Sequence, residues 1–144
     1  MDIQRRNKEI SEAIEAGKRA WKALDKAESC LDSARGFGIW DMVGGGFLSS
    51  ALKHSKVDDA QKYMEKAQRE LSNFSRELRD VQMYGEIRVD FGGLVKGFDM
   101  FCDSFLVDVL VQSKINENRK NVREAKRRVE NAVSQLEQMR RLNG

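Results

Sequence analysis

Proline is absent from this chain of 144 residues, and histidine occurs once, as His54. Because proline interrupts helices and is common in turns, its absence favours long helices joined by few loops. A single histidine argues against His-rich zinc sites and against a Ser–His–Asp triad. The two cysteines, Cys30 and Cys102, lack metal-ligand spacing and are typical of reduced thiols in the cytoplasm.

Long apolar runs are also absent. No stretch of about 18 uncharged apolar residues occurs, so we expect no transmembrane helix. The first 19 residues are charged and amphipathic, unlike a signal peptide, and we expect a soluble, cytoplasmic protein. Hydrophobic residues make up 40% of the chain and charged residues 34%, which indicates a folded chain with a well-solvated surface.

Apolar residues recur at steps of three and four, the spacing of amphipathic helices. The expected helices cover residues 3–34, 39–54, 56–82 and 94–142. In the first helix the apolar positions are Ile3, Ile10, Ile14, Trp21, Leu24 and Leu31, with Asn7, Gly17 and Glu28 as interruptions. The third helix has the most regular seam: Val57, Ala60, Met64, Ala67, Leu71, Phe74, Leu78 and Val81. The last has Ile115, Val122, Ala125, Val129, Ala132, Leu136 and Met139.

The expected boundaries follow from glycine and from changes of pattern. Gly36 and Gly38 should end the first helix, because glycine adopts the left-handed cap conformation easily. In residues 86–91, charged and apolar residues alternate, which fits either an extended connection or a short strand that pairs with a second copy. The helical phase drifts between Gln112 and Asn118, which a stutter in one long helix, bent near Ser113, would explain.

These patterns predict a single all-α domain: a long antiparallel coiled coil or helical bundle. The segments Gly36–His54 and Phe91–Val111 are denser in apolar residues than the rest, and we expect them to pack together or across a dimer interface. Together they would form a glycine-rich interaction head. Its candidate residues are Trp40, Asp41, Gly44, Gly45, Gly46, Lys53, His54, Phe98, Asp99, Phe101, Asp103 and Phe105.

The same head could hold a metal ion. Asp99 and Asp103 lie four residues apart on one helical face, and with His54 they offer oxygen and nitrogen ligands. Salt bridges to Lys53, Lys56 or Lys96, or simple exposure to solvent, are the favoured explanation of these carboxylates. The run Gly44–Gly46 lacks the lysine and hydroxyl of a phosphate-binding loop, so no cofactor is implied.

A basic cluster lies in the last helix. Its residues are Arg119, Lys120, Arg123, Lys126, Arg127 and Arg128. They could bind nucleic-acid phosphates or an anionic membrane surface. Glutamates are interleaved with them, and no aromatic residue in this stretch could stack on bases, which favours an ordinary solvated helix face.

Several short blocks resemble an uncharacterised family of bacterial helical proteins over about the middle half of the chain. The blocks are Trp40-Asp41, Gly44-Gly45-Gly46, Lys53-His54-Ser55, Asp58-Asp59-Ala60, Phe98-Asp99 with Asp103, and Val111-Gln112-Ser113. The resemblance implies a bacterial cytoplasmic origin and one shared site or interface. It brings no activity with it.

The sequence therefore favours a non-enzymatic scaffold or protein-interaction protein, which self-associates or binds a protein partner. Two alternatives remain: binding of nucleic acid or an anionic surface through the basic cluster, and a metal site in the head. No small-molecule substrate and no catalytic residue is indicated.

Overall fold

The computed structural model describes residues 2–44, 47–83, 92–105 and 112–143. It describes side chains within residues 4–32, 59–82, 97–98, 100–105 and 115–141. Among the described residues only Ser104 and Phe105 lie outside a helix, and none forms a strand. The predicted all-α class is confirmed.

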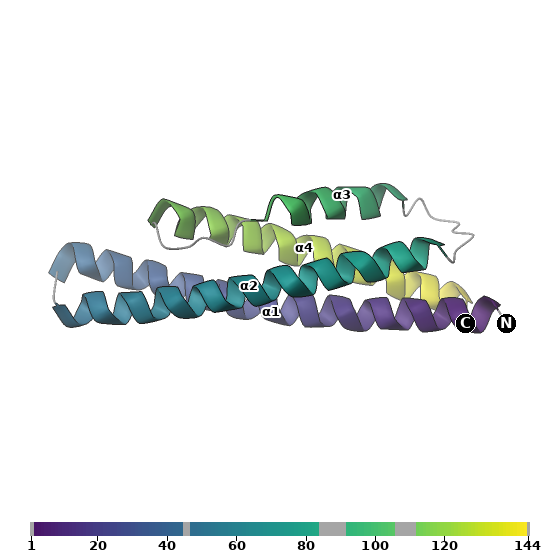
Figure 1. The fold of residues 1–144 in the computed structure, drawn as a ribbon, viewed down its shortest axis with the longest axis horizontal. Helices are drawn as coiled ribbons and strands as arrows, with labels where there is room; N and C mark the ends of the chain where they lie inside the picture. Colours follow the sequence, from purple (N-terminus) through teal and green to yellow (C-terminus); the bar gives the residue numbers. More distant parts are fainter. Residues whose placement is uncertain (1, 45–46, 84–91, 106–111, 144) are drawn as a thin grey trace.

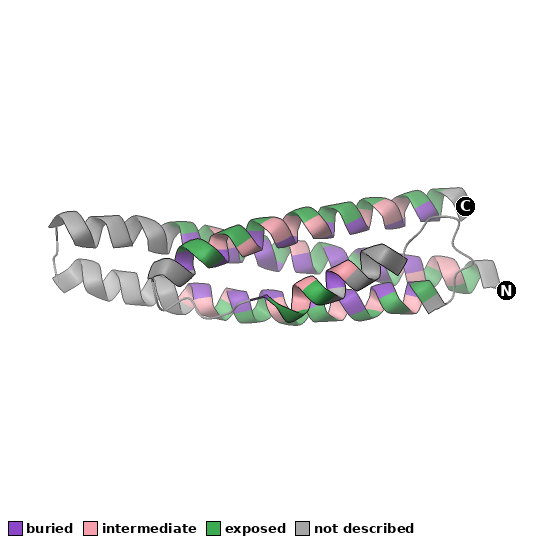
Figure 2. Ribbon diagram, turned by 90° about the horizontal axis from the view of Figure 1, so that it is seen from above, coloured by how far each residue is buried: buried purple, intermediate pink, exposed green. Residues whose placement is uncertain are grey.

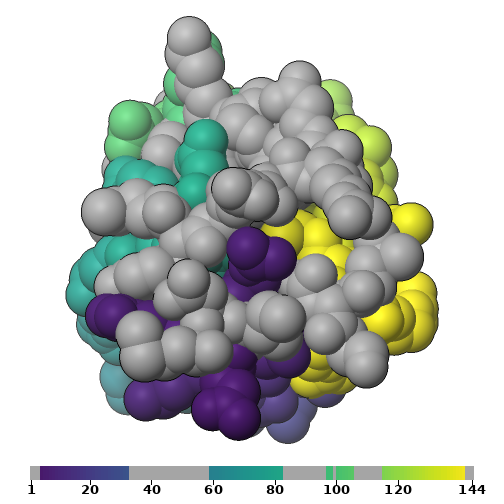
Figure 3. All heavy atoms as spheres, turned by 90° about the vertical axis from the view of Figure 1, so that its right-hand side faces the viewer, coloured from purple at the N-terminus to yellow at the C-terminus, as the bar shows by residue number. Residues whose placement is uncertain are grey.

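Over the described residues the fold consists of four helices: α1 (Asp2–Gly44), α2 (Phe47–Met83), α3 (Gly92–Asp103) and α4 (Gln112–Asn143). The two longest, α1 and α2, form an antiparallel hairpin (Figure 1). Helix α4 also runs antiparallel to α1 and packs along it, so α1 is flanked by two helices that run in one direction. The chain begins and ends at the same end of the bundle, where purple and yellow atoms are neighbours in Figure 3.

Two predicted boundaries in the first half of the chain are wrong. Helix α1 does not end at Gly36 or Gly38 but continues to Gly44, and α2 begins at Phe47, so no separate helix covers 39–54. A glycine costs a helix only about 1 kcal/mol relative to alanine, which a helix of 43 residues tolerates. The predicted connection at 86–91 lies outside the described residues.

The predicted long helix over 94–142 is also wrong, because α3 ends at Asp103 and α4 begins at Gln112. A tight turn closes α3. The amide of Ser104 donates to the carbonyl of Phe101 at 3.2 Å, the amide of Phe105 donates to that of Cys102 at 3.3 Å, and the Ser104 hydroxyl also bonds the Phe101 carbonyl. These short-range bonds satisfy carbonyls that a continuing helix would have used. The apparent drift in helical phase lies within α4, where buried Asn118 continues the spacing between Ile115 and Val122.

The buried residues follow the predicted seams in α2 and α4, as the purple stripes of Figure 2 show. In α2 every seam residue from Ala60 to Val81 is buried, and in α4 every seam residue from Ile115 to Met139 is buried. Val57 lies outside the described side chains. Asn118 occupies a further seam position in α4 and is fully buried.

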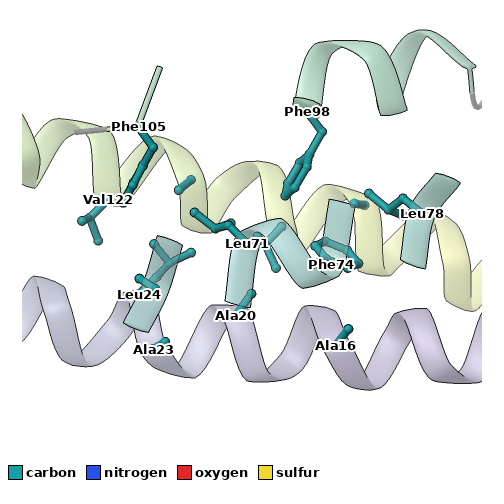
Figure 4. Packing of buried hydrophobic residues seen from close by; sticks show 14 of the residues in the cluster. Ala16, Ala20, Ala23, Leu24, Leu71, Phe74, Leu78, Phe98, Phe105 and Val122 are labelled. Carbon is teal, nitrogen blue, oxygen red and sulfur yellow. The ribbon is translucent and has the colours of Figure 1, made fainter. Parts of the chain in front are cut away.

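Helix α1 buries a wider face, because both α2 and α4 pack on it. Beside the predicted seam runs a row of buried small residues: Ala13, Ala16, Ala20, Ala23 and Ala27. Ala16 and Ala20 lie beneath the larger side chains Phe74 and Leu71 of α2 in the same cluster (Figure 4). Small side chains here let the helices approach closely without losing packing density.

The short helix α3 covers the gap between α2 and α4. Phe98 of α3 packs edge-on against Phe74 of α2, with ring centroids 5.2 Å apart. Phe101 of α3 lies beneath the guanidinium of Arg128 of α4, whose central carbon is 4.9 Å from the ring centroid. These contacts close the core on the side opposite α1.

Candidate interaction surface

The structure divides the predicted interaction head. Eight of the predicted head residues lie outside the part of the chain whose side chains are described. They are Trp40, Asp41, Gly44, Gly45, Gly46, Lys53, His54 and Asp99. Of the rest, Phe98 and Phe105 are buried, Phe101 is half-buried and Asp103 is exposed. The aromatic residues of α3 therefore belong to the core of the bundle.

Within the chain, the two apolar segments do not pack on each other in the part that is described, and their packing across a dimer interface stays a prediction. Helix α3 contacts α2 and α4 but not α1, and it lies over the half of the bundle that holds the termini (Figure 1). The last turn of α1 and the first turn of α2 lie at the other end. Phe98 contacts Phe74 in the C-terminal third of α2, so the density of aromatics in α3 reflects a core contact. Since two of its three ligands are not described, the predicted metal site of His54, Asp99 and Asp103 stays a prediction.

Part of the predicted basic cluster holds α4 to α1. The guanidinium of Arg119 pairs with the carboxylate of Asp32. The ammonium of Lys126 donates to Asp25 at 3.0 Å and lies 3.6 Å from Glu28. Burial alone would lower the pKa of Lys126, but these two carboxylates outweigh it and raise the pKa above its usual range.

The remaining basic residues either pair with Glu124 of the same helix or are exposed to solvent. Arg127 and Arg128 both bond the carboxylate of Glu124, at 2.6 Å and 3.1 Å. The hydrogen bond from Arg127 is the main reason that the pKa of Glu124 is lowered. Exposed members of the cluster are Lys120, Arg123 and Arg127. The cluster is thus not one continuous cationic face, because four of its six members have acidic or aromatic partners within the bundle.

A surface that the sequence did not reveal runs between α1 and α4. It is a groove of about 420 Å³ whose floor is formed by Gly17 and Trp21 of α1 and by Val129 and Val133 of α4. Its α1 side carries Glu15, Lys18, Arg19 and Lys22, and its α4 side carries Glu130, Ser134 and Glu137. An apolar floor between charged sides is the usual composition of a protein-binding surface.

Gly17 shapes the groove. A β-carbon on Gly17 would lie 2.5 Å from Val133 Cγ2 and 3.0 Å from two ring atoms of Phe74. Only glycine therefore lets α2 and α4 approach α1 together at this level. What looked in the sequence like an interruption of the apolar seam is the point where three helices meet.

Trp21 is held on the groove floor by two polar contacts. Its indole Nε1 donates to Glu130 Oε1 at 2.8 Å, and the Lys126 ammonium lies 4.7 Å from the centroid of its ring. Such contacts fix the ring in one orientation while leaving it half-buried. Glu28, another apparent interruption of the seam, supports this arrangement through Lys126. Gly17 and Glu28, which interrupt the apolar seam of the first helix, were the features of the sequence that could have indicated a second helix packed on α1.

A second cluster joins α1 to α2 and is acidic. Carboxylate oxygens of Glu9, Glu12 and Glu77 all lie within 4.8 Å of one another. Burial, and then the charges of Asp80, Glu12 and Glu9, raise the pKa of Glu77, although Arg19 opposes them. Three carboxylates at this spacing could share a divalent cation. Burial together with mutual repulsion between the carboxylates is sufficient to explain the raised pKa of Glu77.

No protein-family model matches the chain, and no match was found among curated proteins or solved structures. Among the described residues, no helix combines the length and the apolar character needed to cross a lipid bilayer. The groove between α1 and α4 is therefore interpreted from its own chemistry.

Proposed function

We propose that this chain is a non-enzymatic scaffold or protein-interaction protein that binds its partner through the α1–α4 groove. The observation that carries the proposal is Trp21, a half-buried aromatic fixed on the floor of an apolar groove. Tryptophan is enriched among the residues that dominate binding energy, and a ring held in place before binding loses little entropy on binding. A cytoplasmic location is part of the proposal.

The shape of the groove supports a helical partner. The groove follows two antiparallel helices, from the level of Glu15 and Glu137 to that of Lys22 and Glu130. Amphipathic helices of a partner packed along its two sides would place their apolar residues over Trp21 and Val133. The charged sides would then pair with the flanking residues of those helices.

Site-directed photo-crosslinking tests the proposal. A benzophenone amino acid is placed at Ser134, on the side of the groove, in cells that express the chain. The matched control carries it at Ser72, an exposed serine of α2 that does not line the groove. We expect a discrete crosslinked product from position 134 that is lost on Trp21→Ala and is missing from position 72. Equal or no crosslinking at the two positions would refute a groove-based binding function.

The exposed basic residues of α4 support a second candidate, binding to nucleic acid or another polyanion. Lys120, Arg123 and Arg127 lie at steps of three and four, which places them on one side of α4. A salt-sensitive gel shift that disappears in the variant Lys120→Glu with Arg123→Glu would support it. Failure to shift DNA or RNA at low salt would eliminate it.

A further inference from the structure

The two sides of the α1–α4 groove differ in charge. Three of the four α1 side residues are basic, whereas the α4 side has two acidic residues and no basic one. The bond from Trp21 to Glu130 sets Lys22 near the level of Glu130. Contact between Gly17 and Val133 likewise sets Lys18 near the level of Ser134, one turn from both glutamates. Opposite charges therefore lie at matching heights at Lys22 and Glu130, and Lys18 lies within one turn of both glutamates.

We propose that the partner in this groove is the same groove of a second copy of the chain. The two copies are related by a two-fold axis that runs parallel to the helices. This inference rests on the proposed function and identifies the partner of the groove. Such an axis places α1 of one copy over α4 of the other at the same height. Lys18 and Lys22 of each copy then face Glu130 and Glu137 of the other. A two-fold perpendicular to the helices would instead set the two basic sides against each other.

The apolar floor supplies the centre of this dimer. Each copy contributes Trp21 and Val133, so two indole rings and two valines would be removed from water together. The surrounding charges select the orientation, since like charges facing each other oppose the alternative pairing. Glu15 is the exception, because it lies near the level of Glu137 and would face that carboxylate in the dimer.

A change of charge on one side at a time tests the pairing. One variant carries Lys18→Glu and the other carries Ser134→Lys, while Glu130 is left unchanged because it accepts the bond from Trp21. The matched control is Lys62→Glu, which reverses one exposed lysine on α2, away from the groove. Analytical ultracentrifugation over a range of concentrations gives the dissociation constant of each protein.

We expect the wild-type chain and the α2 control to dimerise alike. Each groove variant should dimerise at least about tenfold more weakly, because two sets of like charges face each other in its dimer. An equimolar mixture of the two groove variants should recover wild-type association, since both sides of the mixed dimer are then complementary. Mixing that restores nothing, or a wild-type chain that stays monomeric, would overturn the proposal.

Two further measurements separate this inference from the proposed function. Glu15→Gln removes the one repulsive contact, so it should strengthen dimerisation; weaker association would contradict the assigned axis. The product crosslinked from Ser134 should have twice the mass of the chain. A product that contains a different protein would refute the second copy as the partner while leaving the groove as a binding surface.

Discussion

Gly17 of α1 and Val133 of α4 lie so close that a single methyl group on the glycine would reach within 2.5 Å of the valine Cγ2. The same methyl group would also meet the ring of Phe74 from α2 at 3.0 Å. A mid-helix glycine is normally a cost in stability. Here it is the residue that allows α2 and α4 to pack on α1 at one level.

The first prediction concerns this contact. Gly17→Ala should destabilise the bundle by up to about 2 kcal/mol, because overpacking costs about 1–3 kcal/mol while the gain in helix propensity returns about 1 kcal/mol. Urea denaturation measures the change. Val133→Ala in the same chain should recover part of the loss, since it removes the nearest methyl group.

The double-mutant cycle decides whether the clash is the cause. Coupling between the two substitutions of about 0.5 kcal/mol or more would link the loss to Val133. Strict additivity would place the strain elsewhere, with the Phe74 ring as the next candidate.

The second prediction concerns the attachment of α3. Phe98 is buried against Phe74, whereas Met100 of the same helix is 65% exposed. Phe98→Ala should cost about 3 kcal/mol, near the lower end for a buried phenylalanine, because a short helix can detach instead of leaving a cavity. Met100→Ala should cost less than about 0.5 kcal/mol.

Hydrogen exchange shows where that loss falls. Amides of α3 should exchange much faster in Phe98→Ala, while those of α1 near Ala20 should change little. Uniformly faster exchange in all helices would mean that α3 is an integral part of one cooperative unit.

The core of the fold could be predicted from spacing alone where a helix buries one narrow stripe of residues. The seams of α2 and α4 were predicted residue by residue, because each buries a single narrow stripe. For α1, the spacing of the large residues predicted only one of the two rows of residues that are buried. The row from Ala13 to Ala27 lies beside a seam of larger residues that already accounted for one buried face, so a second buried face was not predicted.

The groove could not be predicted for a different reason. It depends on which helices are neighbours, and spacing does not specify that α4 packs on α1. Trp21 looked like any other seam residue until Glu130, 109 positions away, was found beside it. The glycine-rich segment was expected to pack on α3 for the same reason, because the sequence does not specify which helices are neighbours. The density of apolar residues indicates how much surface is buried but not what covers it.

The third prediction tests the polar support of Trp21. Lys126→Met removes the ion pairs with Asp25 and Glu28 and the contact with the indole, and it should destabilise the bundle by about 1–2 kcal/mol. The loss should shrink in 1 M salt, because the ion pairs are partly exposed. Lys120→Met, at an exposed position of the same helix, is the matched control and should change stability by less than about 0.5 kcal/mol. Equal effects of the two substitutions would show that the partners of Lys126 add nothing.

The last prediction concerns pH and the acidic cluster of α1 and α2. Because the pKa of Glu77 is raised in the folded chain, its ionised form is less stable there than in the unfolded chain. Between neutral pH and the ordinary carboxyl pKa of about 4.3, the folded state takes up the proton first, so this group contributes more stability as the pH falls. Glu77→Gln should therefore stabilise the bundle at pH 7 by about 0.5 kcal/mol, the scale of a like-charge pair on neighbouring helical positions.

That gain should disappear as the pH falls through the pKa of Glu77 in the folded chain, because the wild-type carboxyl is then neutral as well. Urea denaturation between pH 4.5 and 8, within the range where carboxyls and histidine titrate, gives the difference at each pH. Glu65→Gln, at an exposed position on α2, serves as the matched control and should give a smaller difference. A Glu77→Gln variant that is less stable than wild type at pH 7 would mean that the carboxylate is engaged in an attractive contact, and that the pull of Arg19 outweighs burial and the three neighbouring acids.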